Sequence, residues 1–458
     1  MLVGFSVSNY KSFQDTQKIS FLASKIARHK DHISTIAGRK VLKSALIFGA
    51  NASGKSNLIK AVKFSKDIIL LGTDRIDLNK KYFRINNESY KIPGIFEYRI
   101  ITDDVEYSYG IAISYDKKEI IAEWLVKIKS GGSEEFIFNR EVDEDGISSV
   151  TSEKTYFTEE ENVRMNVYLE DFRTNISSSF RKKTILSDIA LRVNDKQGYF
   201  KEIKSVYKWF NSIIILFPVS QYCGLNNIAE DDLKKSLFTE FMSFFDTGIV
   251  SVEGKEETFD FDKIVQRLNS EDAEKIKIDI SNASANHPIM LKDNKQIYVL
   301  KKDEHGNIVY NKIQLNHGND EDLFEYADES DGTKRLFDLL PLFYENKRDC
   351  VILIDEIDRS LHTNLTKRFM ELFYELTKDN TCQLMVTTHD SNLLDLEMLR
   401  QDEIWFIERQ KDHSSKVYSL NKFKERFDKK IDKEYLLGRY GSIPIFDETI
   451  LDEENFDD

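Results

Sequence analysis

The sequence predicts an α/β protein in which a largely parallel sheet is accompanied by an antiparallel β lobe and a mainly helical insertion. Residues 45–48 are apolar and are followed by a glycine-rich loop and a helical pattern at 57–64. Residues 351–354 form a second apolar run that ends in acidic residues. After about residue 310, helical patterns alternate with buried strands, which is typical of helices layered on a parallel sheet.

The composition limits the classes of protein that need to be considered. The chain has 458 residues, 41% of them hydrophobic, which is enough to bury the cores of about two to four domains. No apolar run approaches the ~20 residues that a membrane span needs, so no membrane partner is expected. The net charge of −14 disfavours broad electrostatic binding to nucleic acid, although small basic clusters such as 181–183 leave DNA open as a partner.

The cysteines indicate a reducing compartment. Cys223, Cys350 and Cys382 are far apart in sequence and lack the spacing of a metal site. We therefore expect neither zinc nor a disulfide. The first residues lack the layout of a signal peptide, which favours a cytoplasmic protein. Residues 447–458 are acidic and are expected to form a solvated tail, with a partner-docking peptide as the less favoured alternative.

The first of three predicted regions, residues 1–150, is mostly β and contains the glycine-rich loop. Residues 1–13 alternate in the manner of an edge strand. Residues 96–101 and 106–113 are predicted to form an antiparallel pair, and 120–128 to continue that sheet.

The second region, residues 151–285, is predicted to be mainly helical. Apolar residues at 199–210 recur at helical spacing, and 213–219 form a strand or a buried segment within this region. The third region, 286–458, begins with a β-hairpin at 296–310. No heptad run is sustained, so no long coiled coil is expected.

The strongest motif is the loop at residues 49–56, which satisfies G-x-x-x-x-G-K-[ST] between a strand and a helix. Glycines let several backbone N–H groups point at one anion, and the helix N-terminus favours negative charge. Lys55 is expected to reach the β- and γ-phosphates of ATP, and Ser56 to hold Mg²⁺. The predicted nucleotide contacts of this loop are Gly49, Asn51, Ser53, Gly54, Lys55, Ser56 and Asn57.

The acidic residues after the apolar run at 351–354 form the second motif. Asp355 stands where a carboxylate at the C-terminal end of a parallel strand can hold Mg²⁺ through water. Glu356 is expected to orient or deprotonate the water that attacks the γ-phosphate. A strand that ends in acids by chance is the alternative, and its pairing with the phosphate loop makes that alternative less favourable.

Two weaker motifs occupy consistent positions around this strand. Ser330 and Gly332 form a Ser-x-Gly turn that opens a helix. The serine, the glycine backbone and the helix N-terminus can form a second phosphate-binding site. His389 follows the strand predicted at 383–386, at a strand end beside the predicted nucleotide site. Either motif alone would usually be structural, and their order along the chain supports the functional interpretation.

These motifs together resemble those of ABC-type ATPases of the SMC/OLD-like branch, and in particular stand-alone anti-phage defence ATPases of the PARIS AriA, Septu PtuA and RloA type. The stretch at 5–13 and the segment at 435–444 add to the resemblance. It implies that regions 1–150 and 286–458 are the two lobes of an ABC-type ATPase head. Region 151–285 would be an insertion that contacts partners or other copies of the chain.

The resemblance implies a homodimer that sandwiches ATP, and higher homo-oligomers are compatible with it. Ser330 and Gly332 of one copy would complete the phosphate loop of the other, and Asp358 would lie in the D-loop that crosses the interface. His389 would match the family's switch histidine, which contacts the γ-phosphate. The family's Q-loop glutamine has no convincing match, and residues 90–97 lie near the expected position.

The leading functional hypothesis is an ATPase that serves as sensor or scaffold in anti-phage defence. Slow turnover of ATP is compatible with this role. It would hold a separately encoded effector, a nuclease, and release or activate it when a phage protein is sensed. An OLD-type Toprim nuclease domain of about one hundred residues does not fit after residue 411, where no Asp-x-Asp pair occurs. The runner-up is a RecF-like repair ATPase that clamps DNA, while a transporter subunit or a catalytically idle ATPase fits less well.

Overall fold

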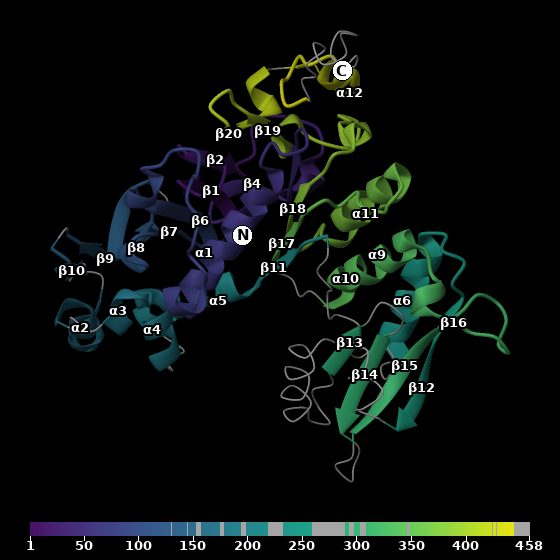
Figure 1. Ribbon diagram of the computed structural model, residues 1–458, viewed down its shortest axis with the longest axis horizontal. Coiled ribbons are helices and arrows are strands. Elements are labelled where there is room, and N and C mark those ends of the chain that lie inside the picture. The colour runs from purple at the N-terminus through teal and green to yellow at the C-terminus, as the bar shows by residue number, and fades with distance from the viewer. Residues whose placement is uncertain are drawn as a thin grey trace, which may run out of the picture. The chain divides into compact units, whose positions relative to one another are not determined.

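The computed structural model describes residues 1–129, 131–143, 145–152, 157–174, 178–193, 198–218, 232–258, 289–292, 297–302, 308–345, 349–423, 425–426 and 428–443. The chain divides into two compact units (Figure 1). The first contains Met1–Phe217, Arg348–Ile357 and Thr377–Asp458, and the second contains Pro218–Lys347 and Asp358–Leu376. The division into 1–150, 151–285 and 286–458 stays a prediction.

An antiparallel sheet forms one layer of the first unit. Its described strands lie in the order β10-β9-β8-β7-β6-β1-β2. The strands are β1 (Leu2–Ser8), β2 (Gln17–Ser20), β6 (Gly94–Thr102), β7 (Val105–Ser114), β8 (Glu119–Ile128), β9 (Glu134–Val142) and β10 (Ser148–Thr151). The predicted pairing of β6 with β7, continued by β8, is confirmed. The prediction that the first strand is an edge strand is wrong, because β2 pairs with the outer side of β1.

A largely parallel sheet forms the other layer, in the order β11-β17-β18-β5-β19-β20. Its strands are β5 (Ser44–Phe48), β11 (Ile213–Leu216), β17 (Val351–Ile354), β18 (Gln383–Thr387), β19 (Ile404–Arg409) and β20 (Ser415–Ser419). Only the β19–β20 pair is antiparallel among these described strands. Every residue of β5, β17 and β18 is buried, as expected for parallel strands covered on both faces. The predicted fold class is confirmed.

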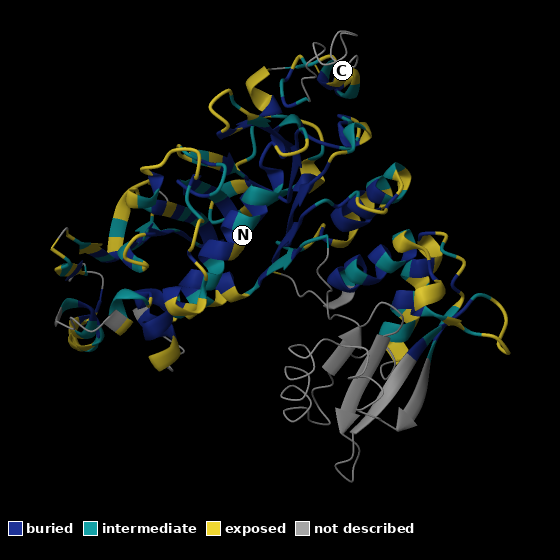
Figure 2. Cartoon of the chain, viewed as in Figure 1, coloured by how far each residue is buried: buried dark blue, intermediate teal, exposed yellow. Residues whose placement is uncertain are grey.

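Helix α1 (Lys55–Leu71) shares one core with both sheets. Its buried residues include Leu58, Ile59 and Val62, which belong to the same hydrophobic cluster as Phe96 of β6 and Met385 of β18. Figure 2 shows the buried residues of the described chain in dark blue. The remaining helices of this unit are α2 (Glu159–Thr174), α3 (Ser178–Arg181), α4 (Ile185–Arg192), α5 (Tyr199–Asn211) and α12 (Ile431–Leu436), and a small hairpin joins β3 (Ile33–Ile36) to β4 (Arg39–Leu42). The core therefore fixes the axis of α1, and with it the loop that precedes the helix.

The second unit has its own sheet and helices. Strands β12 (Ser251–Thr258), β15 (Ile308–Asn316), β14 (Ile297–Lys302) and β13 (Ile289–Lys292) pair in that order, with β16 (Phe324–Glu325) on β15. The predicted hairpin is confirmed by β14 and β15, and its expected turn lies outside the described residues. The α-helices described in this unit are α6 (Asp232–Phe244), α9 (Asp331–Leu339), α10 (Pro341–Glu345) and α11 (Thr363–Leu376).

Helices make up most of the described part of the region predicted to be helical, where α2 to α6 are accompanied by β11 and β12. The longest described helix is α1, with 17 residues, so no long coiled coil occurs in this part of the chain. None of the described helices combines the length and apolar character that crossing a bilayer requires.

Candidate functional site

The loop at residues 49–54 joins β5 to α1 and requires glycine at both ends. A Cβ atom at Gly49 would collide with the carbonyl oxygen of Ile407 in β19. Gly54 has a φ of +111°, and a Cβ there would collide with the side chains of Ser12 and Ser415. Glycine is therefore needed at these two positions for backbone conformation or close packing, and the loop keeps its N–H groups near the N-terminus of α1.

Two serines that the sequence analysis did not select hold this loop from outside. Ser415 Oγ donates to the carbonyl of Ser53 at 2.5 Å, and the Ser415 N–H donates to the carbonyl of Ser12 at 2.7 Å. Asn57 Nδ2 donates to Ser12 Oγ at 2.8 Å. Ser12 lies in the stretch at 5–13 that carried part of the family resemblance, which is the one signal that marked it. Ser415 begins β20, and no motif identifies it.

Lys55 links the phosphate loop to the predicted histidine. Its Nζ donates to the carbonyls of Gly49 at 2.6 Å and Ala50 at 3.0 Å, and it lies 3.1 Å from His389 Nδ1. A lysine ammonium can only donate, so His389 accepts at Nδ1 and carries its proton on Nε2. Nε2 lies 3.6 Å from Glu356 Oε1. The three residues predicted to be catalytic are thus brought together in the first unit.

A threonine at the end of β18 organises the two acidic residues that follow β17. Thr387 Oγ1 donates to Asp355 Oδ1 at 2.6 Å and accepts from the Glu356 N–H at 2.8 Å. The Thr387 carbonyl accepts from the Ile357 N–H at 3.0 Å. Glu356 has a φ of +52°, a left-handed conformation that costs a non-glycine residue on the order of 1–3 kcal/mol. The bonds to Thr387 hold the backbone in this conformation.

Asp355 and Ser56 sit at the positions that the sequence predicts for Mg²⁺ ligands. Asp355 is 2% exposed and follows the last residue of β17, and its N–H donates to the carbonyl of Leu216 in β11 at 2.8 Å. Ser56 is the second residue of α1 and is half-buried. Asn51 is exposed within the loop. These residues have the oxygen donors that Mg²⁺ prefers, and the loop has the backbone donors that a triphosphate needs.

The predicted signature and D-loop residues lie in the second unit. Ser330 is the N-cap of α9, and its Oγ accepts from the Thr333 N–H at 3.1 Å. A Cβ at Gly332 would lie 2.9 Å from the carbonyl oxygen of Ser360. The Asp358 carbonyl accepts from the Leu361 N–H at 3.1 Å. The turn that opens α9 therefore packs closely against the backbone of the segment that contains Asp358.

Residues 90–97, near the position expected for a Q-loop, lie in and next to the antiparallel sheet and not beside β17. Residues 90–97 belong to a 3₁₀ turn (Ser89–Lys91) and the beginning of β6, in the antiparallel sheet. β17 lies between β11 and β18, and β11 ends at Leu216 next to Asp355. Gln221 follows in the sequence and lies outside the described residues. The sequence analysis treated 213–219 as part of the helical insertion and so did not connect it to the site.

Two cysteines that are distant in sequence lie together at the opposite ends of the same two strands. Cys350 precedes β17 and Cys382 precedes β18; both are buried free thiols with Sγ atoms 2.8 Å apart. The hydrogen bond with Cys382, together with burial, raises the pKa of the Cys350 thiol. Cys223 lies outside the described residues.

Three comparisons place the chain among known proteins. No curated protein sequence matches it. One solved structure that matches is the "SMC head domain from Thermotoga maritima", which is 15% identical with a TM-score of 0.37, and the match covers 91% of this chain and 98% of that chain. Residues 44–395 match the family model described as "AAA domain, putative AbiEii toxin, Type IV TA system". Because this match spans more than half of the chain, the protein belongs to that family of AAA domains.

Proposed function

We propose that this protein binds and hydrolyses Mg·ATP at the cluster of Lys55, Glu356 and His389. The observation that carries the proposal is their convergence: the ends of β5, β17 and β18 bring these residues into a row with separations of 3.1 and 3.6 Å. Family membership supports the coarser statement that the chain is an ATPase of the AAA or ABC type. A purely structural role for the contact between Lys55 and His389 would leave the glycine loop and the buried carboxylate of Asp355 unexplained.

Each residue has a distinct role in this proposal. Lys55 and the N–H groups of the loop bind the phosphates, and Ser56 and Asp355 hold Mg²⁺, which would neutralise charge on the β- and γ-phosphates. The Glu356 side chain is about one-third exposed, so water can reach its carboxylate, which takes a proton from the attacking water. The Nε2–H of His389 points to the same region as a donor.

The signature residues would act from a second copy of the chain. Ser330 and Gly332 open α9, whose N-terminal N–H groups favour an anion, and Asp358 belongs to the segment packed against Gly332. In the symmetric dimer that we propose, each ATP lies between the phosphate loop of one copy and α9 of the other. ATP would then hold the two copies together, and hydrolysis would release them. Higher homo-oligomers can be built from such dimers.

We further propose that the ATPase is the sensor or scaffold of an anti-phage defence system. It would hold a separately encoded effector nuclease and release or activate it when a phage protein is sensed. The family description names a putative toxin of a toxin–antitoxin system, which is compatible with a role in defence. The helical segments between residues 151 and 285 are the proposed region of contact. A RecF-like ATPase that clamps DNA is the alternative.

Native mass spectrometry of the protein isolated from its own host, with and without ATP, tests this role. A stable complex with the product of a neighbouring gene supports the sensor–effector proposal and identifies the effector. A dimer that forms only with ATP, lacks a protein partner and gains mass with DNA contradicts it and supports the RecF-like alternative.

A further inference from the structure

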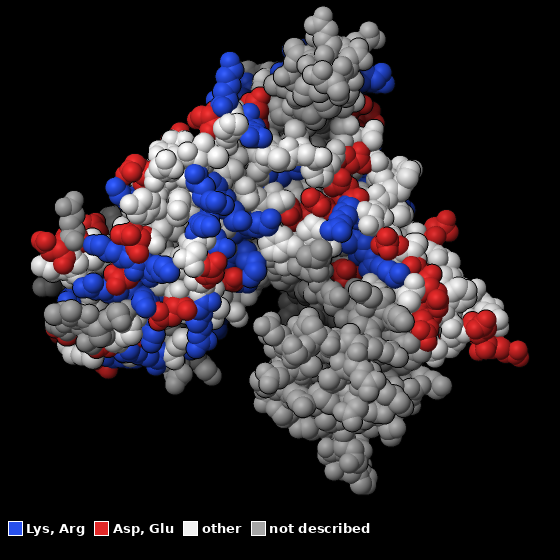
Figure 3. Space-filling model, viewed as in Figure 1, with Lys and Arg blue, Asp and Glu red and all other residues white. Residues whose placement is uncertain are grey.

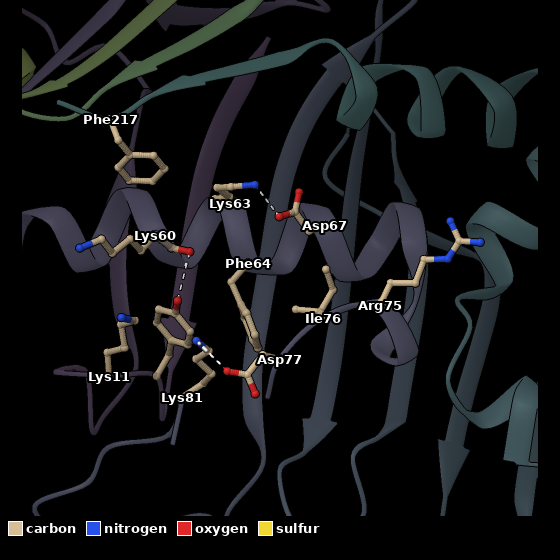
Figure 4. A pocket seen from close by; sticks show the side chains of 11 residues that line it. Lys11, Lys60, Lys63, Phe64, Asp67, Arg75, Ile76, Asp77, Lys81 and Phe217 are labelled. Carbon is tan, nitrogen blue, oxygen red and sulfur yellow. Dashed lines mark hydrogen bonds and ion pairs between the residues drawn. The ribbon is translucent and has the colours of Figure 1, made fainter. Parts of the chain in front are cut away.

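The solvent-facing side of α1 lines a pocket that is separate from the phosphate loop. The pocket has a volume of about 360 Å³. Its charged lining consists of Lys60, Lys63 and Asp67 of α1 together with Lys11, Arg75, Asp77 and Lys81 (Figure 4). None of the loop residues 49–57 lines it, and neither do Asp355, Glu356 or His389.

The pocket is cationic on an acidic protein. Five cationic side chains, Lys11, Lys60, Lys63, Arg75 and Lys81, face two carboxylates, Asp67 and Asp77, which leaves a local charge of +3 against −14 for the whole chain. Lys and Arg side chains also gather over α1 in the space-filling view (Figure 3).

Among the described residues, two of these five cations have a carboxylate partner. Lys63 Nζ lies 2.7 Å from Asp67 Oδ2, and Lys81 Nζ lies 3.5 Å from Asp77 Oδ2. Within the described part of the chain, neither Lys11, Lys60 nor Arg75 forms an ion pair. The pocket therefore presents positive charge that its own acids do not match.

The backbone holds three of these cations together despite their repulsion. Lys11 lies in the turn after β1 with a φ of +50°, and its N–H donates to the carbonyl of Lys81 at 2.7 Å. Lys11, Lys60 and Lys81 are half-buried and lie at one end of the pocket, with Arg75 at the other (Figure 4). Burial lowers the pKa of Lys11, and the nearby charges of Lys60 and Lys81 lower it further. A bound anion would relieve this repulsion.

Apolar residues complete the lining. The Tyr10 hydroxyl donates to the carbonyl of Lys60 at 3.2 Å. The centroids of the Tyr10 and Phe64 rings lie 5.0 Å apart. Ile76 and the half-buried Phe217 also line the pocket. A cationic end beside apolar and aromatic walls suits a ligand with phosphate at one side and a flat apolar group at the other.

We propose that this pocket binds a small phosphorylated ligand of the nucleotide class, at a site distinct from the one that hydrolyses ATP. The volume lies in the range of small-ligand pockets, about 300–1,000 Å³. A nucleic-acid polymer fits less well, because it would experience the repulsion of the whole acidic surface, whereas a small anion experiences mainly the local charge.

Calorimetric titration of the full chain tests this proposal in a Lys55→Ala background, which removes the main cation of the phosphate loop. Inorganic phosphate and AMP are the probes, and a single-stranded oligonucleotide is the comparison. The double substitution Lys11→Gln/Lys60→Gln should weaken AMP binding about tenfold or more, because two charge-assisted contacts are lost. Asp67→Asn should tighten binding, because it removes a carboxylate and frees Lys63 from its ion pair.

Lys208→Gln on α5 is the matched control, since Lys208 is exposed and does not line the pocket. Weaker binding in the double variant with unchanged binding in Lys208→Gln supports the proposal, provided that thermal unfolding shows both variants folded. Equal AMP binding in all variants, or no AMP binding at all, overturns it. Oligonucleotide binding that depends on the same lysines without AMP binding also overturns it and assigns the surface to nucleic acid.

Discussion

Thr387 and Asp355 are joined by a hydrogen bond of 2.6 Å between the C-terminal ends of two neighbouring parallel strands. The same hydroxyl accepts from the Glu356 N–H, so one side chain positions both acids. Thr387 is completely buried, which means that no solvent can replace its bonds without rearrangement. The proposed Mg²⁺ ligand and the proposed base are therefore held in register by one buried hydroxyl.

Replacing Thr387 with valine should lower kcat for ATP hydrolysis by roughly tenfold to a hundredfold, because the Asp355 carboxylate and the Glu356 N–H both lose a buried partner. Binding of radiolabelled ATP should change much less. Thr387→Ser keeps the hydroxyl and is expected to retain most of the activity. If valine and serine variants hydrolyse ATP equally fast, Thr387 has no positioning role.

Replacing Glu356 with glutamine should reduce hydrolysis by about a hundredfold or more, because the amide cannot take a proton from water. ATP binding should persist, so the variant should accumulate as an ATP-bound assembly in native mass spectrometry. An unchanged hydrolysis rate would show that another group is the base.

Replacing Lys55 with alanine should abolish ATP hydrolysis and the binding of radiolabelled ATP to the phosphate loop, because the phosphates lose their main cation there. The loop should keep its conformation in this variant, because the hydrogen bonds of Ser12 and Ser415 do not involve Lys55. Lys208→Ala, on the surface of α5, is the control and should bind ATP as the wild type does. Wild-type binding by Lys55→Ala would refute the assignment of the phosphate site.

Glu123 offers a test of the fold rather than of catalysis. Its buried carboxylate accepts from the N–H groups of Ile185 and Leu186 at the start of α4, at 2.7 and 3.0 Å, and from the hydroxyl of Tyr109 at 2.9 Å. Glu123→Ala should lower the free energy of unfolding by about 3 kcal/mol, because these donors lose their acceptor in the core. Urea unfolding followed by circular dichroism measures the difference.

The same residue should make stability depend on pH. Burial raises the pKa of Glu123 above its ordinary value of 4.5, although the hydrogen bonds and Arg140 partly oppose the shift. The folded state therefore binds this proton more tightly than the unfolded state, and stability should fall as pH rises from about 4.5 through the folded pKa. The slope that Glu123 contributes should vanish in Glu123→Gln. An identical pH profile in both proteins would contradict the raised pKa.

Patterns within one segment predicted much of the fold and the site. The strand, glycine loop and helix at 45–64 and the acids after 351–354 are local signals, and the structure has β5, α1 and β17 there. Pairing of β6 with β7 and β8 also follows from neighbouring alternating segments.

The remaining features depend on contacts between distant parts of the chain. Ser12 meets Ser415, and β11 joins β17 across a long insertion, so no local pattern could show either pairing. The position of β1 inside its sheet depends in the same way on where β2 and β6 pair. The role of Thr387 depends on which strand lies beside β17, and a threonine at a strand end carries no signal of its own.

The central claim is that each ATP site is completed by a second copy of the chain, and mixing two inactive variants tests it most directly. Lys55→Ala lacks a working phosphate loop, and Ser330→Arg lacks a working signature. If Ser330 acts across the dimer, each heterodimer contains one site with both parts intact. An equimolar mixture should then regain about a quarter of the wild-type rate if subunits exchange randomly and sites act independently. No hydrolysis above that of the separate variants, with heterodimers visible in native mass spectrometry, would contradict the claim.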